Sequence, residues 1–148
     1  VPESGFNVEH TWPQSRGADQ EPPKSDLHHL FPTATEANTR RSAHHFGDVV
    51  GNVSWSSGGS QVGEDSSGEI RFEPRDQHKG NVARAMFYFA VIYEKQIPEH
   101  EESTLRQWHE QDPVDAAERS RNQAVADVQN SRNPFVDYPQ IADQIDDF

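Results

Sequence analysis

NVEHTWPQS, at residues 7–15, and SDLHHLFPTATEANTRR, at residues 25–41, decide the fold of this chain. Residues 7–10 and 27–31 have the composition of short extended segments. Residues 35–46 follow Pro32 and predict a helix. The order strand, strand, helix brings a carboxylate, an imidazole and a carboxamide into one small unit.

Glu9, His10 and Asn38 carry the candidate chemistry of this unit. Carboxylate and carboxamide oxygens suit Mg²⁺, which keeps most of its water and takes one or two protein oxygens. An imidazole that is neutral near pH 7 accepts a proton from water. Because neighbours on a regular strand point to opposite faces, we expect Glu9 and His10 at a strand end or bulge. Together these groups can hydrolyse a phosphodiester.

The middle of the chain predicts a Gly/Ser-rich connection, a strand and a buried helix. Residues 54–68 read as an irregular loop or a hairpin connection. Residues 69–73 alternate charged and apolar side chains, which is typical of a half-buried strand. Apolar residues recur at helical spacing over residues 81–95, so a largely buried helix is expected there.

The last third of the chain predicts two more helices and a docked tail. Residues 102–111 form the first, and the second starts with Asp112 as N-cap and Pro113 in its first turn. The expected apolar face of the second helix comprises Val114, Ala117, Ala124, Val125 and Val128. The tail, residues 135–148, is expected to dock on the body through Phe135, Tyr138 and Ile141.

The length of 148 residues indicates one domain with its own core. The chain has no cysteine, so disulfides and thiolate metal sites are excluded. No apolar run approaches the roughly 20 residues that span a bilayer, and we expect no membrane partner. The chain opens at Val1 rather than Met, which suggests a processed or trimmed product.

The net charge of −12 argues against bulk attraction to DNA or to an anionic membrane. Any contact with nucleic acid must then use a local basic patch. The middle of the chain offers Arg40, Arg41, Arg71, Arg75, Lys79 and Arg84. We expect the nucleic-acid contacts to come from Arg16, Arg40, Lys79 and Arg84. The acid excess and the low count of three lysines also suggest salt tolerance, with ordinary solubility as the simpler explanation.

Four histidines outside the first motif raise the question of zinc. His28 and His29 are neighbours on an extended segment, so one is expected to face inward and the other outward. With His44 and His45 they could form a zinc site, but such sites need converging ligands, and packing is the simpler role. Trp12 is expected in the core rather than stacked on a base.

Five blocks, in this order, resemble the bacterial endonuclease I family: NVEHTWPQS, SDLHHLFPTATEANTRRS, KGNVARAMFYFAVIYE, LRQWHEQDPVDAAERSRN and RNPFVDYP. The resemblance implies a secreted or periplasmic nuclease with a ββα-metal active site. It implies that such an enzyme cuts DNA, and often RNA, with little sequence preference and leaves a 5′-phosphate. It also implies that His10 is the general base and that Glu9 and Asn38 hold the divalent ion. For a phosphate-stabilising arginine the candidates are Arg16 and Arg41.

We therefore expect an α+β, mostly helical fold, with a single domain over residues 1–148 around a ββα-metal (His-Me finger) unit. The expected cofactor is Mg²⁺, with Mn²⁺ or Ca²⁺ able to replace it in binding. The expected substrates of this monomer are DNA and RNA, cut without sequence preference because contacts go to phosphate and sugar. Two alternatives stay open, a zinc-dependent hydrolase and a non-catalytic acidic interaction domain with the same fold.

Overall fold

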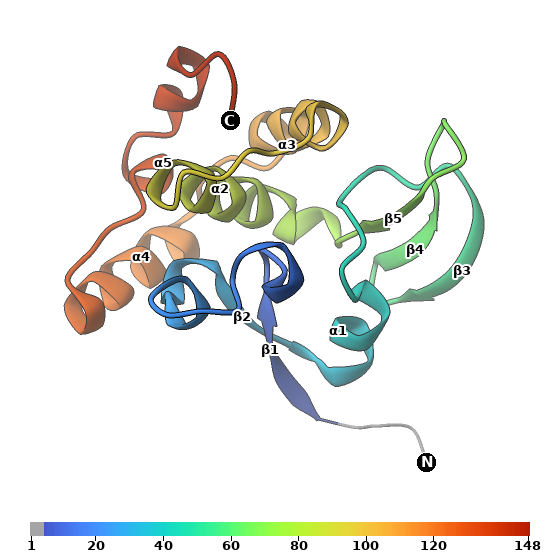
Figure 1. The fold of residues 1–148 in the computed structure, drawn as a ribbon, viewed down its shortest axis with the longest axis horizontal. Helices are drawn as coiled ribbons and strands as arrows, with labels where there is room; N and C mark the ends of the chain where they lie inside the picture. The colour runs from blue at the N-terminus through green and yellow to red at the C-terminus, as the bar shows by residue number, and fades with distance from the viewer. Residues whose placement is uncertain (1–4) are drawn as a thin grey trace.

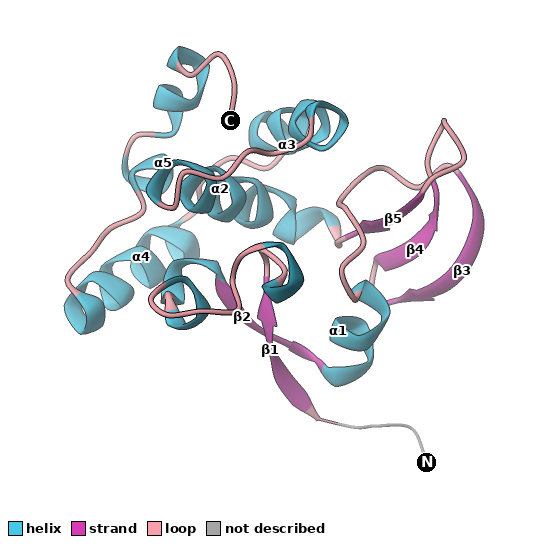
Figure 2. Cartoon of the chain, in the orientation of Figure 1, coloured by secondary structure: helices cyan, strands magenta, loops and turns pink. Residues whose placement is uncertain are grey.

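Helices and two small antiparallel sheets form an α+β fold in the computed structural model, which describes residues 5–148 (Figures 1 and 2). The strands are β1 (Phe6–His10), β2 (Leu30–Ala34), β3 (Gly51–Ser57), β4 (Ser60–Glu64) and β5 (Ile70–Glu73). The helices are α1 (Thr35–Arg41), α2 (Asp76–Ile92), α3 (Glu99–Gln111), α4 (Ala116–Gln129) and α5 (Pro134–Asp137). Between residues 5 and 148, no helix combines the length and the apolar character that crossing a membrane requires.

The predicted order of strand, strand and helix is confirmed by β1, β2 and α1. β1 pairs with β2 in an unbroken antiparallel register, which places Glu9 opposite Phe31. The second strand starts later than predicted, because residues 27–29 form a 3₁₀ turn. The side chain of Asp26 accepts a hydrogen bond from the backbone N–H of His28 and so favours the turn. The helix is also shorter than predicted and stops at Arg41, because Ser42 has a positive φ of 48°.

The second sheet has the order β3-β4-β5. The Gly/Ser-rich segment does contain the expected hairpin, and its arms are strands rather than irregular loop. Gly58 and Gly59 connect β3 and β4 with φ values of 60° and 92°, which suit a two-residue hairpin turn. The strand predicted at residues 69–73 is confirmed as β5.

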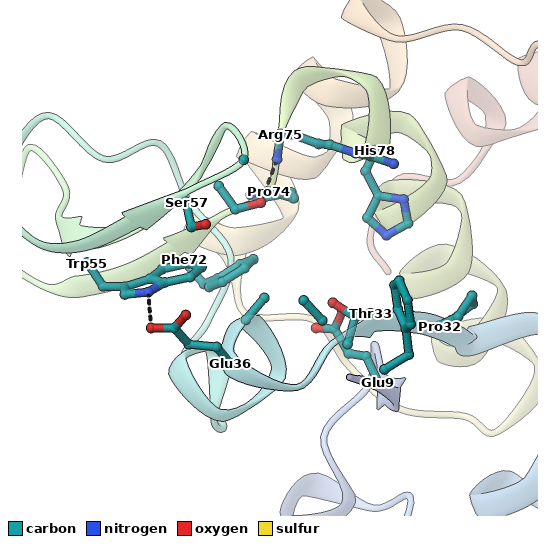
Figure 3. Close-up of a pocket in the computed structure, with 15 residues that line it drawn as sticks. Glu9, Pro32, Thr33, Glu36, Trp55, Ser57, Phe72, Pro74, Arg75 and His78 are labelled. Carbon is teal, nitrogen blue, oxygen red and sulfur yellow. Dashed lines mark hydrogen bonds between the residues drawn. The ribbon is translucent and has the colours of Figure 1, made fainter. Parts of the chain in front are cut away.

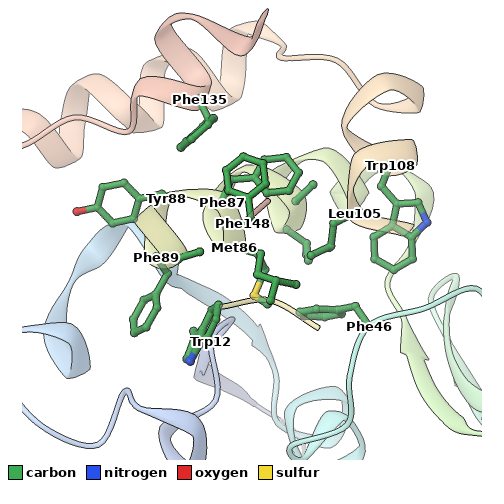
Figure 4. Packing of buried hydrophobic residues seen from close by; sticks show 14 of the residues in the cluster. Trp12, Phe46, Met86, Phe87, Tyr88, Phe89, Leu105, Trp108, Phe135 and Phe148 are labelled. Carbon is green, nitrogen blue, oxygen red and sulfur yellow. The ribbon is translucent and has the colours of Figure 1, made fainter. Parts of the chain in front are cut away.

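The central helix α2 supplies more of the core than any other element, and its buried residues lie between Lys79 and Ala90. Trp12 stacks on Phe89 with ring centroids 4.8 Å apart, which confirms its predicted place in the core (Figure 4). On the opposite side of α2, Phe87 stacks on Phe148 with centroids 4.2 Å apart. The β1–β2 unit and the C-terminal segment are thus held by the same helix.

The predicted start of α4 is wrong. Asp115, not Asp112, caps this helix by accepting a hydrogen bond from the N–H of Glu118. Asp112 instead accepts from the N–H of Gly80 at 2.8 Å, where α2 approaches so closely that a Cβ on Gly80 would lie 1.9 Å from the Asp112 carbonyl. The Asp112 carboxylate therefore binds to α2, and Asp115 is the residue that reaches the first turn of α4.

The predicted apolar face of α4 is confirmed only at Val125. Val128 is 76% exposed, and the buried residues of the helix are Glu118, Asn122 and Val125. Glu118 accepts two hydrogen bonds of 2.7 Å from the guanidinium of Arg84, which is fully buried. The buried face of α4 is therefore polar because its partner on α2 is a charge.

The tail docks as predicted through Phe135, which is 1% exposed, and Ile141 packs against the core. Tyr138 does not dock and is 61% exposed. It lies at the turn after the short helix α5, where the buried contacts come from Phe135 and Val136.

Removing the partner of a buried charge tests this description of α2 and α4. Glu118→Ala leaves the Arg84 guanidinium buried and uncompensated, so we expect the free energy of unfolding to fall by about 3–5 kcal/mol. Urea denaturation followed by circular dichroism measures the change. Arg119→Ala, one residue along at an exposed position, is the control and should change stability by about 0.5 kcal/mol or less. A small effect of Glu118→Ala would contradict the buried ion pair.

Candidate active site

His10 ends β1 and is half-buried, with its ring orientation set by neighbouring polar groups. Its Nε2 lies 3.0 Å from the carbonyl oxygen of Lys24. A carbonyl only accepts hydrogen bonds, so Nε2 carries the proton of the neutral ring and Nδ1 keeps its lone pair. The side-chain amide nitrogen of Gln14 lies 3.3 Å from Nδ1 and 3.4 Å from Nε2, so it approaches the ring between its two nitrogens. The arrangement leaves one nitrogen able to accept a proton.

A pocket of about 500 Å³, here called the His10 pocket, is lined by His10 and by Asn38 of α1. The rest of its lining is mostly small or polar: Asn7, Val8, Pro13, Gln14, Ser15, Ser42 and Ala43. The Asn38 amide nitrogen lies 3.5 Å from the carbonyl oxygen of Val8. Among the described hydrogen bonds none uses Asn38 Oδ1, so this hard oxygen is available to a ligand. The structure thus brings together two of the three residues of the predicted constellation.

Glu9 lies on the other face of β1. His10 is the last residue of the strand, as expected, but the regular register still turns the two side chains into different pockets. Glu9 is 8% exposed, and its Oε1 accepts a hydrogen bond from Arg41 at 3.0 Å. The expectation that Glu9 and His10 face one pocket is therefore wrong in this arrangement.

Arg41 does not fit the predicted contact with phosphate, because its side chain is buried and all its bonds are internal. Its guanidinium donates to Glu9, to the carbonyls of His10 and Thr11, and to the carbonyl of His44. The group also lies 4.0 Å from the ring centroid of Phe46. Burial lowers the pKa of Arg41, and the charge of Glu9 opposes that shift. Arg41 is a positioning residue that fixes α1 against β1.

Two of the predicted nucleic-acid contacts are likewise engaged inside the fold. Arg84 is fully buried against Glu118, as described above, so it cannot reach a substrate. Lys79 is 8% exposed, and its ammonium pairs with Glu73 at 2.8 Å and with Asp76 at 2.9 Å. Both predictions fail because each cation has a carboxylate partner from its own fold.

The other two predicted contacts remain accessible. Arg40 is exposed on α1, two residues after Asn38 of the His10 pocket. Arg16 is half-exposed and donates to the carbonyl of Ala43 at 2.7 Å, and Ala43 lines the same pocket. Both arginines therefore lie near the candidate site.

The four remaining histidines of the first half do not converge. His28 and His29 are both buried, so the expected alternation is wrong, and they face the carbonyls of Ser131 and Pro23. His45 lies instead beside Glu101 of α3. Within residues 5–148 no group of three or more His, Asp or Glu side chains could hold a metal ion. The zinc alternative has no site in this part of the chain.

Asp26 is the centre of a hydrogen-bond network that lies close to His10. Its carboxylate accepts hydrogen bonds from the hydroxyls of Tyr88 at 2.6 Å and Tyr93 at 2.5 Å, and from the side-chain amide of Gln129. Burial raises the pKa of Asp26, but these hydrogen bonds outweigh it and the net pKa is lowered. The network fixes the 3₁₀ turn that carries His29, whose ring lies 5.6 Å from that of His10.

The donor set fits a hydrated Mg²⁺ better than a metal held by many side chains. Asn38 lines the His10 pocket, and Mg²⁺ needs only one or two protein oxygens because it keeps several waters. Arg41 engages one oxygen of Glu9, and among the described hydrogen bonds none uses the second. The residues present therefore suit an ion at Asn38, with Glu9 on the adjacent face of β1.

Gln14 is a site residue that the sequence did not reveal as one. It begins a 3₁₀ turn (Gln14–Arg16) four residues after His10, and this spacing is the only signal available. The carbonyl of Lys24, which sets the protonated nitrogen of His10, is a backbone group and has no sequence signal at all.

The chain belongs to the endonuclease I family, because the family model described as Endonuclease I matches residues 2–140. It is 36% identical over 164 residues to the extracellular ribonuclease of Bacillus subtilis (strain 168), which covers 95% of this chain and 54% of that protein. It is 28% identical over 114 residues to the periplasmic deoxyribonuclease of Aeromonas hydrophila, over 77% of this chain and 48% of that protein. The chain thus spans about half the length of these relatives.

Protonation of His29 gives a test of the buried histidine layer. Burial lowers the pKa of His29 from 6.5 to about 4, so the unfolded chain binds this proton more readily than the folded one. Stability from this group is fully present above pH 6.5 and is lost as the pH falls toward 4. In the wild type, His29 should contribute on the order of 3 kcal/mol to the fall in the free energy of unfolding between pH 7.5 and 4.5. This contribution should be missing in His29→Gln. Urea denaturation at pH 7.5, 6 and 4.5 measures it in both proteins. An unchanged pH dependence would contradict the assignment.

Proposed function

We propose that this chain is a divalent-metal-dependent endonuclease that hydrolyses phosphodiester bonds in both DNA and RNA without sequence preference. Membership of the endonuclease I family supports it, as do relatives named ribonuclease and deoxyribonuclease. The observation that carries the proposal is the orientation of His10. The contact of Nε2 with the Lys24 carbonyl leaves Nδ1 as a base in a pocket shared with Asn38.

In the proposed reaction Nδ1 of His10 removes a proton from a water in the His10 pocket. The resulting hydroxide attacks phosphorus, the bond from phosphorus to the 3′-oxygen breaks, and the products are a 5′-phosphate and a 3′-hydroxyl. Gln14 and the Lys24 carbonyl hold the ring so that the lone pair keeps its direction. Positioned proton transfer of this kind contributes about 10²–10⁴-fold to a rate.

Asn38 Oδ1 would hold the ion in the His10 pocket, for which Mg²⁺ is the expected choice and Mn²⁺ or Ca²⁺ could replace it in binding. Glu9 is the second proposed ligand and would have to turn toward that pocket, because it lines a different one in this structure. When bound, such an ion neutralises charge on the phosphate and supplies a coordinated water as acid for the departing oxygen. Arg41 pairs with the Glu9 carboxylate and holds it in place on β1. A secreted or periplasmic location is proposed from relatives named extracellular and periplasmic.

Removal of the base is the first test. His10→Ala should lower the rate of plasmid cleavage with Mg²⁺ by roughly 10²-fold or more. The measurement is the loss of supercoiled DNA with time on a gel, alongside a melting curve to show that the variant folds.

The matched control is His100→Ala, an exposed histidine on α3 outside the His10 pocket, which should cleave at the wild-type rate. Near-normal turnover by His10→Ala would reject the base assignment. Absence of cleavage by the wild type, with and without chelator, would favour the non-catalytic interaction domain.

Removal of the oxygen at position 38 is the second test. Asn38→Leu keeps the approximate size of the side chain but offers no ligand, so the Mg²⁺ concentration for half-maximal cleavage should rise roughly ten-fold or more, equal to about 1.4 kcal/mol. The rise in melting temperature caused by Mg²⁺ should shrink as well, which is a readout independent of activity. Thr39→Ala, on the exposed side of the same helix, is the control. Identical Mg²⁺ titrations for Asn38→Leu and wild type would contradict this ligand.

A further inference from the structure

A second pocket, here called the Trp55 pocket, lies between the β1–β2 unit and the β3-β4-β5 sheet. It has a volume of about 310 Å³. Figure 3 shows Trp55 and Phe72 on one side of it and Pro32, Thr33 and Glu9 on the other. The lining thus joins an aromatic wall to the face of β1 that carries Glu9.

The aromatic wall is held in place. The Trp55 indole N–H donates to Oε1 of Glu36 at 3.0 Å, and the indole lies at 21° to the ring of Phe72 with centroids 6.3 Å apart. Phe72 is buried, whereas Trp55 is partly exposed. A fixed, partly exposed indole offers a flat surface to a ligand at little cost in conformational entropy.

Arg75 lines the same pocket and is exposed. Its backbone N–H is anchored by the hydroxyl of Ser60, while within residues 5–148 its guanidinium makes no ion pair. This distinguishes it from Lys79 and Arg84, whose charges are matched by carboxylates. An unmatched guanidinium beside an aromatic surface is a combination that suits a nucleotide, which has both a π face and a phosphate.

The two pockets are near enough to share one strand of nucleic acid. Glu9 lines the Trp55 pocket and the next residue, His10, lines the His10 pocket. In the same way Ala37 of α1 lines the first and Asn38 lines the second. Consecutive Cα atoms are 3.8 Å apart, so the pockets lie on the two sides of a single layer of backbone.

We propose that the Trp55 pocket binds one unpaired base of a single-stranded segment, next to the phosphate at His10, with Arg75 contacting a neighbouring phosphate. The base stacks on Trp55, and the polar groups of Glu36, Ser57 and Ser60 lie at its edge. Every base has a π face, so such a subsite is tolerant of sequence. A base in a duplex is already stacked and paired, so this subsite favours single strands. The inference rests on the proposed function only for the place of the cleaved phosphate.

Binding of a short fluorescein-labelled single-stranded DNA tests the subsite by fluorescence anisotropy. The protein is measured in EDTA, and again with Mg²⁺ in the His10→Ala background, so that cleavage does not interfere. Trp55→Ala should weaken binding roughly ten-fold or more, and Trp55→Phe, which keeps a ring, should weaken it less. Arg75→Ala should weaken it by a few-fold. The same sequence as a duplex should bind roughly ten-fold more weakly than the single strand.

Two control variants separate the subsite from general effects. Val53→Ala changes an exposed residue of β3 outside the pocket, and Arg119→Ala removes an exposed arginine on α4. Both should bind like the wild type. Indole fluorescence adds a signature, because Trp12 and Trp108 are buried and quenching by the oligonucleotide should vanish in Trp55→Phe.

Binding by Trp55→Ala within two-fold of the wild type, or no binding in either condition, would overturn the inference. Because Trp55 packs on Phe72, the Arg75→Ala and Trp55→Phe variants keep the test valid if Trp55→Ala fails to fold. Wild-type protein that binds through Trp55 but never cleaves would contradict the proposed function and leave this subsite standing. If the Trp55 variants bind and cleave like the wild type, the proposed function stands and this subsite is contradicted.

Discussion

The buried guanidinium of Arg41 is the interaction on which the candidate site depends. Removing such a charge from water costs several kcal/mol unless it is paired and fully hydrogen-bonded. Here the Arg41 guanidinium donates hydrogen bonds to the Glu9 carboxylate and to backbone carbonyls before and after α1 in the sequence. It also lies over the Phe46 ring. The pair locks the edge of β1 to α1, so the distance between His10 and Asn38 is set by the core. Glu9 therefore stabilises the fold, in addition to any role as a metal ligand.

Apolar periodicity predicted α2, because its buried apolar side chains are close together in sequence. The strand β5 also forms where it was predicted, but alternation does not describe its burial, because Arg71 and Phe72 are buried and Ile70 is 41% exposed. Apolar periodicity failed for α4, whose buried face is made by Glu118 and Asn122. Their partners, Arg84 and Asn133, lie 34 and 11 residues away along the chain. A sequence pattern carries no record of such pairings. Arg84 was predicted as a nucleic-acid contact for the same reason, because its carboxylate partner lies 34 residues away along the chain. Lys79 is different, since its partners Glu73 and Asp76 lie only six and three residues before it.

The motif predicted only part of the arrangement of its three residues. His10 and Asn38 do meet at one pocket, whereas alternation along β1 sends Glu9 to the other face, as strand geometry alone would require. The Trp55 pocket could not be foreseen, because Trp55 lies in a Gly/Ser-rich segment that reads as a connection. Only the pairing of β3 with β4, closed by Gly58 and Gly59, turns that segment into a sheet that carries an aromatic side chain toward β1.

Most cations of this acidic chain are neutralised from within, as the ion pairs of Arg41, Arg71, Lys79, Arg84 and Arg106 show. The exposed cations that have no ion-pair partner within residues 5–148 are Lys24, Arg40, Arg75, Lys95 and Arg119. Association with a polyanion can then release only a few condensed counterions, since each phosphate neutralised contributes a slope of about −0.7 to −0.9 in log affinity against log ionic strength. Such a protein would bind a nucleic acid through base stacking and metal bridging. High salt concentrations would then weaken its binding less than that of a protein that binds through many lysines and arginines.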